Sequence, residues 1–280
     1  MLLVALPCNG QNAGKNDRKK NKKPSGKVVK DARNTSTGNP DPPRDPELAQ
    51  YGIYAKTAPR AGSATAVPTT LPIELKAGDK IALIGNSLFE RSQDFGNLEG
   101  LIQQAFPDRK VSVRHLAWSA DAVDEQPRPD NFADTFQHLA HEKADVIFAA
   151  FGFNESFAGE KGLDGFRANL NHFVGELKSK AFNGETAPQV VLVSPIANEN
   201  LPSVAAADMN NDSIAAYVDV MREVAAEHDI GFADVFGETR KQFESLGSDH
   251  TINGIHLDEQ GDRFVSSLIF EKTFGIDPPT

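Results

Sequence analysis

The sequence contains a single cysteine, Cys8, among its 280 residues. One thiol can neither form a disulfide within the chain nor build a cysteine-based structural zinc site. Long apolar runs are also missing, because the longest, from Met1 to Cys8, is far shorter than the roughly 20 residues that span a bilayer. Basic residues are outnumbered, at 29 against 39 acidic ones, which gives a net charge of −10. These shortages argue against a disulfide scaffold, a membrane-spanning chain and a nucleic-acid-binding protein.

The first 70 residues differ in composition from the rest of the chain. Nine basic and two acidic residues lie in residues 1–33, whereas the remaining 247 residues carry a net charge of −17. Nine of the 17 prolines fall in residues 1–72, and no apolar period runs through this stretch. Such a segment buries too little surface to offset its ordering entropy. We therefore expect a disordered or linker segment over residues 1–70 and a folded domain over residues 71–280.

Residues 1–10 begin with an apolar run that resembles the end of the hydrophobic region of a secretory signal peptide. No positively charged segment precedes the run, which indicates a truncated signal peptide or a misplaced start. Pro7 fits poorly with a lipoprotein signal at Cys8. These residues favour a secreted or periplasmic protein.

From about residue 72, short apolar runs alternate with amphipathic periods. Apolar runs predict strands at residues 80–85, 111–116, 145–151, 189–194 and 231–235. Apolar residues spaced by three and four predict helices at residues 98–105, 132–140, 163–177, 214–224 and 264–269. Strands separated by helices pair in parallel, with helices on both faces of the sheet. We predict a flavodoxin-like, doubly wound α/β domain of three layers with about five parallel strands.

Polar residues follow the predicted strands. The first strand ends in Gly85–Ser87, the second is followed by Trp118–Asp121 and the third by Gly152–Glu155, while Asn253–His256 precedes the last helix. Ligands of such a sheet bind beyond the carboxyl ends of its strands. These segments supply a hydroxyl, backbone N–H groups, a carboxamide and an imidazole, which are the parts of acyl transfer.

In order and spacing, these four segments resemble the four blocks of the SGNH, or GDSL-type, hydrolases, over roughly residues 79–270. The resemblance implies that Ser87 is the nucleophile and His256 the general base. It implies an oxyanion hole built from the N–H groups of Ser87 and Ala120 and the amide of Asn154. The function implied is a serine esterase that hydrolyses carboxylic esters, with O-acetyl groups of carbohydrates as one candidate substrate.

Three positions depart from the family pattern. Asn86 replaces the aspartate before the nucleophile, and Ala120 replaces a glycine whose N–H still serves if φ stays negative. Asn253 replaces the aspartate of the triad, the most serious change, because that carboxylate stabilises the imidazolium. The Asn253 oxygen can still accept the imidazole N–H. Otherwise another carboxylate takes its place, with Asp249, Asp258 and Glu155 as candidates, or a Ser-His dyad works without one.

Two other functions are compatible with the same segments. A catalytically weakened module of the same family would bind a carbohydrate or small ligand without turnover. A flavodoxin-like module would bind phosphate at the first strand–helix turn, although a glycine-rich phosphate loop is missing.

No cofactor is expected, and no metal, since His138 and His141 have no partner cluster. The expected partner is a small-molecule or carbohydrate ester. Residues 195–200 are a candidate substrate wall that carries Asn198 and Glu199.

Overall fold

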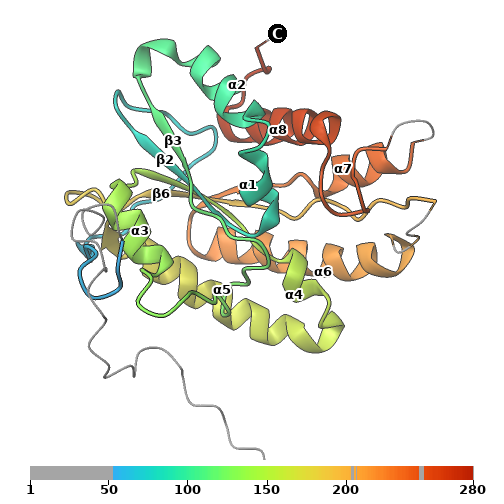
Figure 1. The fold of residues 1–280 in the computed structure, drawn as a ribbon, viewed down its shortest axis with the longest axis horizontal. Coiled ribbons are helices and arrows are strands. Elements are labelled where there is room, and N and C mark those ends of the chain that lie inside the picture. Colours follow the sequence, from blue (N-terminus) through green and yellow to red (C-terminus); the bar gives the residue numbers. More distant parts are fainter. Residues whose placement is uncertain (1–52, 203–204, 206, 246–248, 280) are drawn as a thin grey trace, which may run out of the picture. The chain divides into compact units, whose positions relative to one another are not determined.

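The computed structural model describes residues 53–202, 205, 207–245 and 249–279. The chain divides into two compact units, residues 1–44 and 45–280, and every described residue lies in the second. The described residues are coloured along the sequence in Figure 1. The signal-like residues 1–10 lie outside them.

A five-stranded sheet forms the centre of the second unit (Figure 1). Its strands are β2 (Lys80–Gly85), β3 (Ser112–His115), β4 (Val146–Ala150), β6 (Gln189–Val193) and β7 (Gly231–Ala233). They lie in the order β3-β2-β4-β6-β7, and all neighbouring pairs are parallel. Counted along the chain this is the order 2-1-3-4-5 of flavodoxin-like folds. The predicted α/β fold is confirmed.

The sequence of the central strands follows from their burial on both faces. Ile81 and Leu83 of β2 point into one core cluster, whereas Ala82 and Ile84 point into the other. In β4, Val146–Ala149 are completely buried. A parallel sheet covered by helices on both faces requires such continuous apolar runs, because successive side chains alternate between two dry layers.

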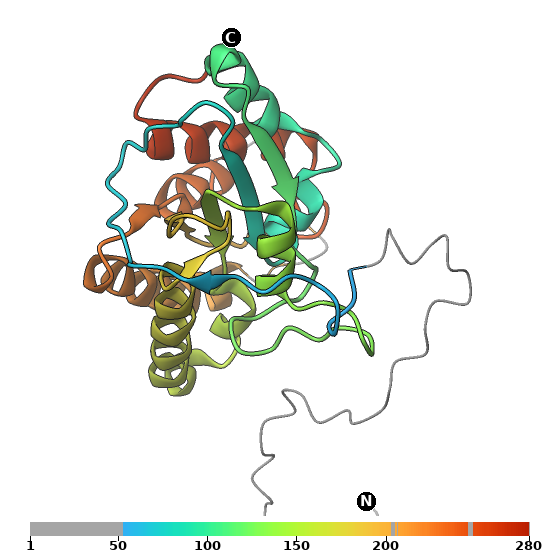
Figure 2. The same cartoon turned by 90° about the vertical axis from the view of Figure 1, so that its left-hand side faces the viewer.

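Helices cover both faces of the sheet, as Figures 1 and 2 show. One core cluster contains side chains from α1 (Ser87–Ser92), α2 (Asn97–Ala105), α7 (Phe236–Phe243) and α8 (Glu259–Phe274). The other contains side chains from α3 (Thr135–Glu142), α5 (Leu163–Lys178) and α6 (Ala207–Glu227). A short helix, α4 (Phe153–Ser156), follows β4. Within the described ranges, no helix is long and apolar enough to cross a bilayer.

Two features of the helices differ from the sequence-based expectation. The helix predicted over residues 132–140 begins at Thr135, because Asp134 caps it. The Asp134 carboxylate accepts the Gln137 N–H at 2.8 Å, and the Gln137 side chain accepts the Asp134 N–H at 3.2 Å, which is a capping box. Helices α1, α4 and α7 were not predicted, since each has only one or two turns and shows no apolar period.

Residues 53–70 pack on the folded domain. In this stretch β1 (Gly62–Ser63) pairs antiparallel with β5 (Lys180–Ala181). The buried Thr69 hydroxyl accepts the Val190 N–H at 2.9 Å. Composition did not reveal these contacts, because backbone and hydroxyl groups make them rather than an apolar stripe. For residues 1–52, which lie outside the described residues, the linker assignment stays a prediction.

The hydrogen bond from Val190 to Thr69 gives a test of this packing. Thr69→Val should lower the free energy of unfolding by about 1–3 kcal/mol, because a buried N–H loses its acceptor. Urea denaturation measures this loss. Thr70→Val, a matched change at the exposed neighbouring threonine, is the control. Equal unfolding midpoints for the two variants would contradict a structural role for residues 53–70.

Candidate active site

A pocket lies at the carboxyl ends of β2 and β4. Its lining includes Ser87 at the start of α1, Phe153 at the start of α4 and His256 from the loop before α8. This is the edge at which doubly wound sheets bind ligands. The fold therefore brings the predicted nucleophile and the predicted base into one pocket.

The turn between β2 and α1 positions Ser87. Gly85 has a φ of +115°, and Asn86 donates its N–H to the Ala150 carbonyl at 3.1 Å. The Asn86 side chain then accepts the Leu88 N–H at 3.1 Å and caps α1. Asn86 thus supports the turn that carries Ser87 through its backbone N–H and its side chain. It does so although it stands where the resembled family has an aspartate. Ser87 is half-buried and is the first residue of the helix.

The Asn253 carboxamide contacts His256 through its nitrogen. Asn253 Nδ2 lies 3.0 Å from His256 Nδ1. Asn253 Oδ1 accepts the backbone N–H of His256 at 3.0 Å and that of Ile255 at 3.3 Å. Because backbone N–H groups only donate, the atom that faces them must be the oxygen, and this fixes which way the amide points.

This orientation determines the tautomer of the neutral His256 ring. An amide nitrogen only donates, so His256 Nδ1 is the acceptor and the ring proton sits on Nε2. The expectation that the Asn253 oxygen accepts the imidazole N–H is therefore wrong, since the backbone occupies that oxygen. A histidine that acts as a base at Nε2 needs the opposite tautomer.

The charges around the His256 ring favour its neutral form. Burial lowers the pKa of His256, and the positive charge of Arg91 lowers it further, while Glu90 opposes both effects. Glu90 in turn accepts a hydrogen bond from the Ser119 hydroxyl at 2.9 Å. A neutral imidazole can accept a proton, so these surroundings suit a base in all but its tautomer.

Two buried residues after β6 hold the loop that carries His256. The Glu199 carboxylate accepts the Thr251 hydroxyl at 2.6 Å and the His250 N–H at 3.0 Å. The Asn198 amide donates to the Gly254 carbonyl at 2.8 Å. Asn198 and Glu199 are both 2% exposed, so they position the loop and are not a substrate wall as expected. Their neighbours Pro195 and Ile196 do line the pocket.

None of the three carboxylates nominated to replace the triad aspartate contacts the His256 ring within the described part of the chain. Asp258 caps α8 by accepting the Gly261 N–H at 2.8 Å. Glu155 accepts two backbone N–H groups elsewhere. Asp249 has no bond to the ring either. Asn253 is therefore the residue that contacts Nδ1.

The remaining oxyanion candidates, Ala120 and Asn154, lie close to each other. The Asn154 amide donates to the carbonyl of Asp121, the residue after Ala120, at 3.0 Å. Ala120 has a φ of +65°, so the predicted negative φ is not observed. A non-glycine residue in this left-handed region costs about 1 kcal/mol, which explains why glycine suits the position. Neither residue is part of the pocket lining that contains Ser87 and His256.

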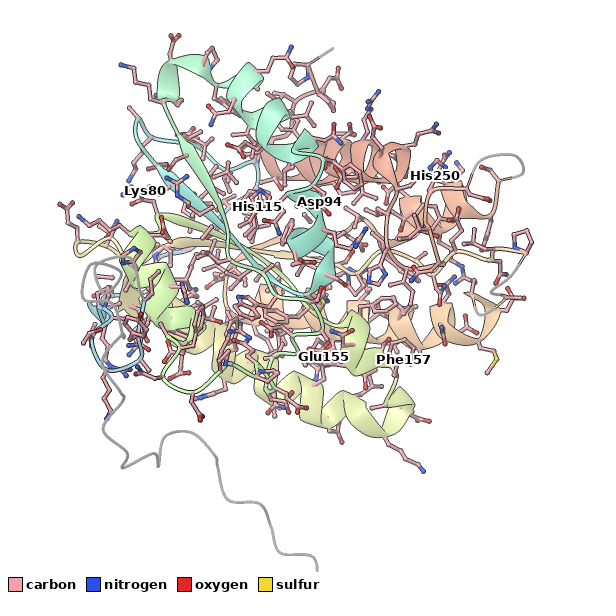
Figure 3. All side chains as sticks on the ribbon, in the orientation of Figure 1. Lys80, Asp94, His115, Glu155, Phe157 and His250 are labelled. Carbon is pink, nitrogen blue, oxygen red and sulfur yellow. The ribbon has the colours of Figure 1, made fainter. Side chains whose placement is uncertain are left out.

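Glu155, labelled in Figure 3, connects the segment after Trp118–Asp121 to its own segment, Gly152–Glu155, by hydrogen bonds. Its carboxylate accepts the Gly152 N–H and the Val123 N–H, both at 2.9 Å. Burial raises the pKa of Glu155, and these two hydrogen bonds partly offset the rise. Beside it, Asp121 forms a bidentate pair with Arg128 at 2.8 and 2.7 Å. Hydrogen bonds to Glu155 and to Arg128 thus hold the segment from Ala120 to Val123 in place.

The pocket also contains two charged residues to which the sequence analysis assigned no role. Arg91 lies one helical turn after Ser87 on α1, and Asp262 lies on α8. Burial raises the pKa of Asp262 to about 6, although hydrogen bonds from Asn97 and Ser266 oppose the rise. The sequence did contain a signal for Arg91 at the site. It lies four residues after Ser87, and this spacing places both residues on one face of a helix.

Comparisons with solved structures show the same architecture. The enzyme LAE5, described as an alpha/beta hydrolase from the metagenome of Lake Arreo, is 18% identical, with a TM-score of 0.53 over 71% of this chain and 96% of its own. The acetylxylan esterase Axe2 from Geobacillus stearothermophilus is 17% identical, with a TM-score of 0.55 over 73% of this chain and 98% of its own. No curated protein matches.

A family profile matches the part of the chain that carries the site. The profile of the GDSL-like Lipase/Acylhydrolase family covers residues 83–264, from β2 to α8, and so includes all four predicted blocks. That span is well over half of the chain, and it places the protein among ester hydrolases rather than phosphate-binding modules. The chain belongs to the GDSL-like lipase/acylhydrolase family.

Proposed function

We propose that the protein hydrolyses carboxylic esters through an acyl intermediate on Ser87. The Ser87 oxygen attacks the ester carbonyl while His256 Nε2 takes the hydroxyl proton. His256 then gives that proton to the departing alcohol, and water releases the acyl group by the same route. The observation that carries the proposal is the pocket that Ser87 and His256 share.

The oxyanion hole in this proposal consists of the Ser87 N–H group and the Asn154 amide, without the Ala120 N–H, because the negative φ that its role required is not observed. Ser87 opens α1, so its N–H has no acceptor within the helix. One hydrogen of the Asn154 amide bonds to Asp121, which leaves the second for the oxyanion. Donors of this kind contribute about 3 kcal/mol each to the stability of the transition state.

Asn253 makes the proposed enzyme slow. With the proton on Nε2, the neutral His256 ring cannot accept a proton from Ser87 at that atom. Turnover requires the other tautomer, in which Nδ1–H opposes the Asn253 NH₂ group. A serine protease whose triad aspartate is changed to asparagine has the same defect and loses about 10⁴ in kcat.

Acetyl esters of carbohydrates are the substrates we favour. Axe2 is named an acetylxylan esterase. Its catalytic mutants replace a serine, an aspartate and a histidine, and the last two lie three positions apart. Asn253 and His256 have the same spacing, which supports equivalent places for them. Secretion or export to the periplasm is also a proposal, supported by residues 1–10 alone.

The orientation of Asn253 also favours a second candidate, a module that binds such a ligand without hydrolysing it. In that case His256 Nε2–H donates a hydrogen bond to the ligand instead of taking a proton from Ser87. The two candidates differ in whether Ser87 becomes acylated, which the next experiment measures.

Hydrolysis of 4-nitrophenyl acetate tests the proposal. We expect slow turnover by the wild type and loss to the uncatalysed rate in Ser87→Ala and His256→Ala. Ser267→Ala, at a half-buried serine on α8, and His172→Ala, at an exposed histidine on α5, are the matched controls. A fluorophosphonate probe should label Ser87 in the wild type. Equal inactivity of the wild type and Ser87→Ala, with no label on Ser87, would instead support the binding module.

Asn253→Asp should raise kcat by as much as about 10⁴-fold, because an aspartate keeps one oxygen on the backbone and turns the other to accept Nδ1–H. Asn253→Ala, which removes the opposing amide but supplies no acceptor for Nδ1–H, is the comparison and should gain far less than Asn253→Asp. Steady-state kinetics measures both. A lower kcat in Asn253→Asp than in the wild type would show that catalysis uses the amide N–H.

The pH dependence of kcat/KM reports the protonation of His256. A base must be neutral, so activity is lost as the pH falls through its pKa. Since burial and Arg91 lower that pKa, the acidic limb should lie below the ordinary value of about 6.5. Asn253→Asp should move the limb upward, because a carboxylate stabilises the imidazolium. A wild-type limb above 6.5 would contradict the assignment of His256 as the base.

A further inference from the structure

Arg91 is a pocket residue that has no hydrogen-bond or ion-pair partner among the described residues. It lines the pocket together with Ser87 and His256, four residues after Ser87 on α1. Among the described residues, its guanidinium forms no ion pair and no hydrogen bond, and its Nε is buried. Arg128, the other arginine near the site, is by contrast paired with Asp121 through two hydrogen bonds. Arg91 is thus available to a ligand.

The carboxylates around Arg91 are bonded to other groups. Asp262, which lines the same pocket, accepts the Asn97 amide at 2.8 Å and the Ser266 hydroxyl at 3.4 Å. Its charge also interacts with His115 and Asp94, which are labelled in Figure 3. Glu90 accepts the Ser119 hydroxyl. The charge of Arg91 is therefore not cancelled by a direct contact with a described residue.

The charge of Arg91 acts where the proposed reaction takes place. It lowers the pKa of His256, so the guanidinium lies within electrostatic reach of the imidazole. The rest of the lining is largely apolar and includes Leu88, Phe95, Phe153 and Ile255. In such surroundings a charge interacts more strongly than in water, and a buried N–H without an acceptor is costly. A ligand oxygen at Arg91 removes that cost.

We propose that Arg91 binds a carboxylate on the ester substrate, so that the enzyme prefers anionic esters over neutral ones. The proposal rests on the proposed function, because it places this carboxylate in the pocket where Ser87 attacks the ester. A guanidinium matches a carboxylate with two parallel hydrogen bonds. Since Ser87 and Arg91 share one face of α1, the carboxylate and the ester carbonyl lie about one helical turn apart along the helix.

Two pairs of esters test the proposal and locate the carboxylate. 4-Nitrophenyl hydrogen succinate against 4-nitrophenyl acetate places the charge on the acyl part. 4-Acetoxybenzoate against its methyl ester places the charge on the alcohol part. For at least one pair, we expect the wild type to favour the anionic ester by about 10-fold or more in kcat/KM, the effect of one charge-assisted hydrogen bond. High salt should weaken the preference.

Variants of Arg91 then distinguish a specific effect of this residue from the effect of positive charge elsewhere on the protein. Arg91→Gln should abolish the preference, and Arg91→Lys should retain part of it, since the charge stays and the paired hydrogen bonds are lost. Arg263→Gln removes the same charge from an exposed site on α8 and should keep the full preference. If Arg91→Gln does not fold, Arg91→Lys decides. No preference in the wild type for either pair, or an unchanged preference in the Arg91 variants, overturns the proposal.

Failure of the proposed function has a different signature. If the wild type cleaves none of the four esters, hydrolysis has failed and binding is measured by itself. Calorimetric titration with succinate then compares the wild type with Arg91→Gln and Arg263→Gln. Binding that Arg91→Gln alone weakens supports the anion site without catalysis. Equal binding by all three proteins, or no binding, overturns it.

Discussion

The close approach of β2 and β4 at their carboxyl ends is the constraint on which the site depends. A side-chain carbon added to Gly85 would lie 2.0 Å from the Ala150 carbonyl oxygen. Glycine alone fits there, and its φ of +115° turns the chain out of the sheet. The next N–H bonds to that same carbonyl, and α1 then begins at Ser87. This one contact places Ser87 and, one turn later, Arg91 at the pocket.

A second set of contacts brings the other half of the site to the first. Glu199 lies in the segment that follows β6, the neighbour of β4 on the side opposite β2, and it bonds to the chain at His250 and Thr251. His250 is labelled in Figure 3 beside α7 and α8. The loop around Asn253 is therefore attached to the segment after β6 and not only to α8. These hydrogen bonds hold the loop that carries His256 at the pocket, which the proposed catalysis requires.

Much of the fold was predictable because it follows from simple patterns. The five apolar runs gave the strands, and the alternation with helices gave their parallel pairing. The segment before Thr69 was not recognised, since its contacts are made by backbone and hydroxyl groups and leave no apolar pattern in the sequence. The short helices α1, α4 and α7 were missed for a related reason, because so few turns show no period.

For the site, the sequence placed Ser87 and His256 at the same edge of the sheet, where strand ends and the late loop converge, and both residues line the pocket there, while their catalytic roles stay a proposal. It could not predict which atom of Asn253 faces the imidazole, because that depends on two backbone N–H groups placed by the loop. Nor could it show that Glu199 is buried or that Arg91 has no bonded partner in the described part of the chain. These properties arise from three-dimensional packing and not from spacing along the chain.

The hydrogen bond between Gly254 and Thr251 has a consequence for the chemical durability of the site. An asparagine followed by glycine is prone to deamidation, in which the glycine nitrogen attacks the asparagine side chain and leaves an acidic residue. Here the Gly254 N–H is engaged by the buried Thr251 hydroxyl at 2.8 Å, in a loop that Asn198 also holds. An N–H held in a hydrogen bond is a poorer nucleophile than a free one, so this bond opposes ring closure onto the Asn253 carboxamide. We therefore expect Asn253 to remain an amide for longer than in a free loop, and the tautomer of His256 to persist with it.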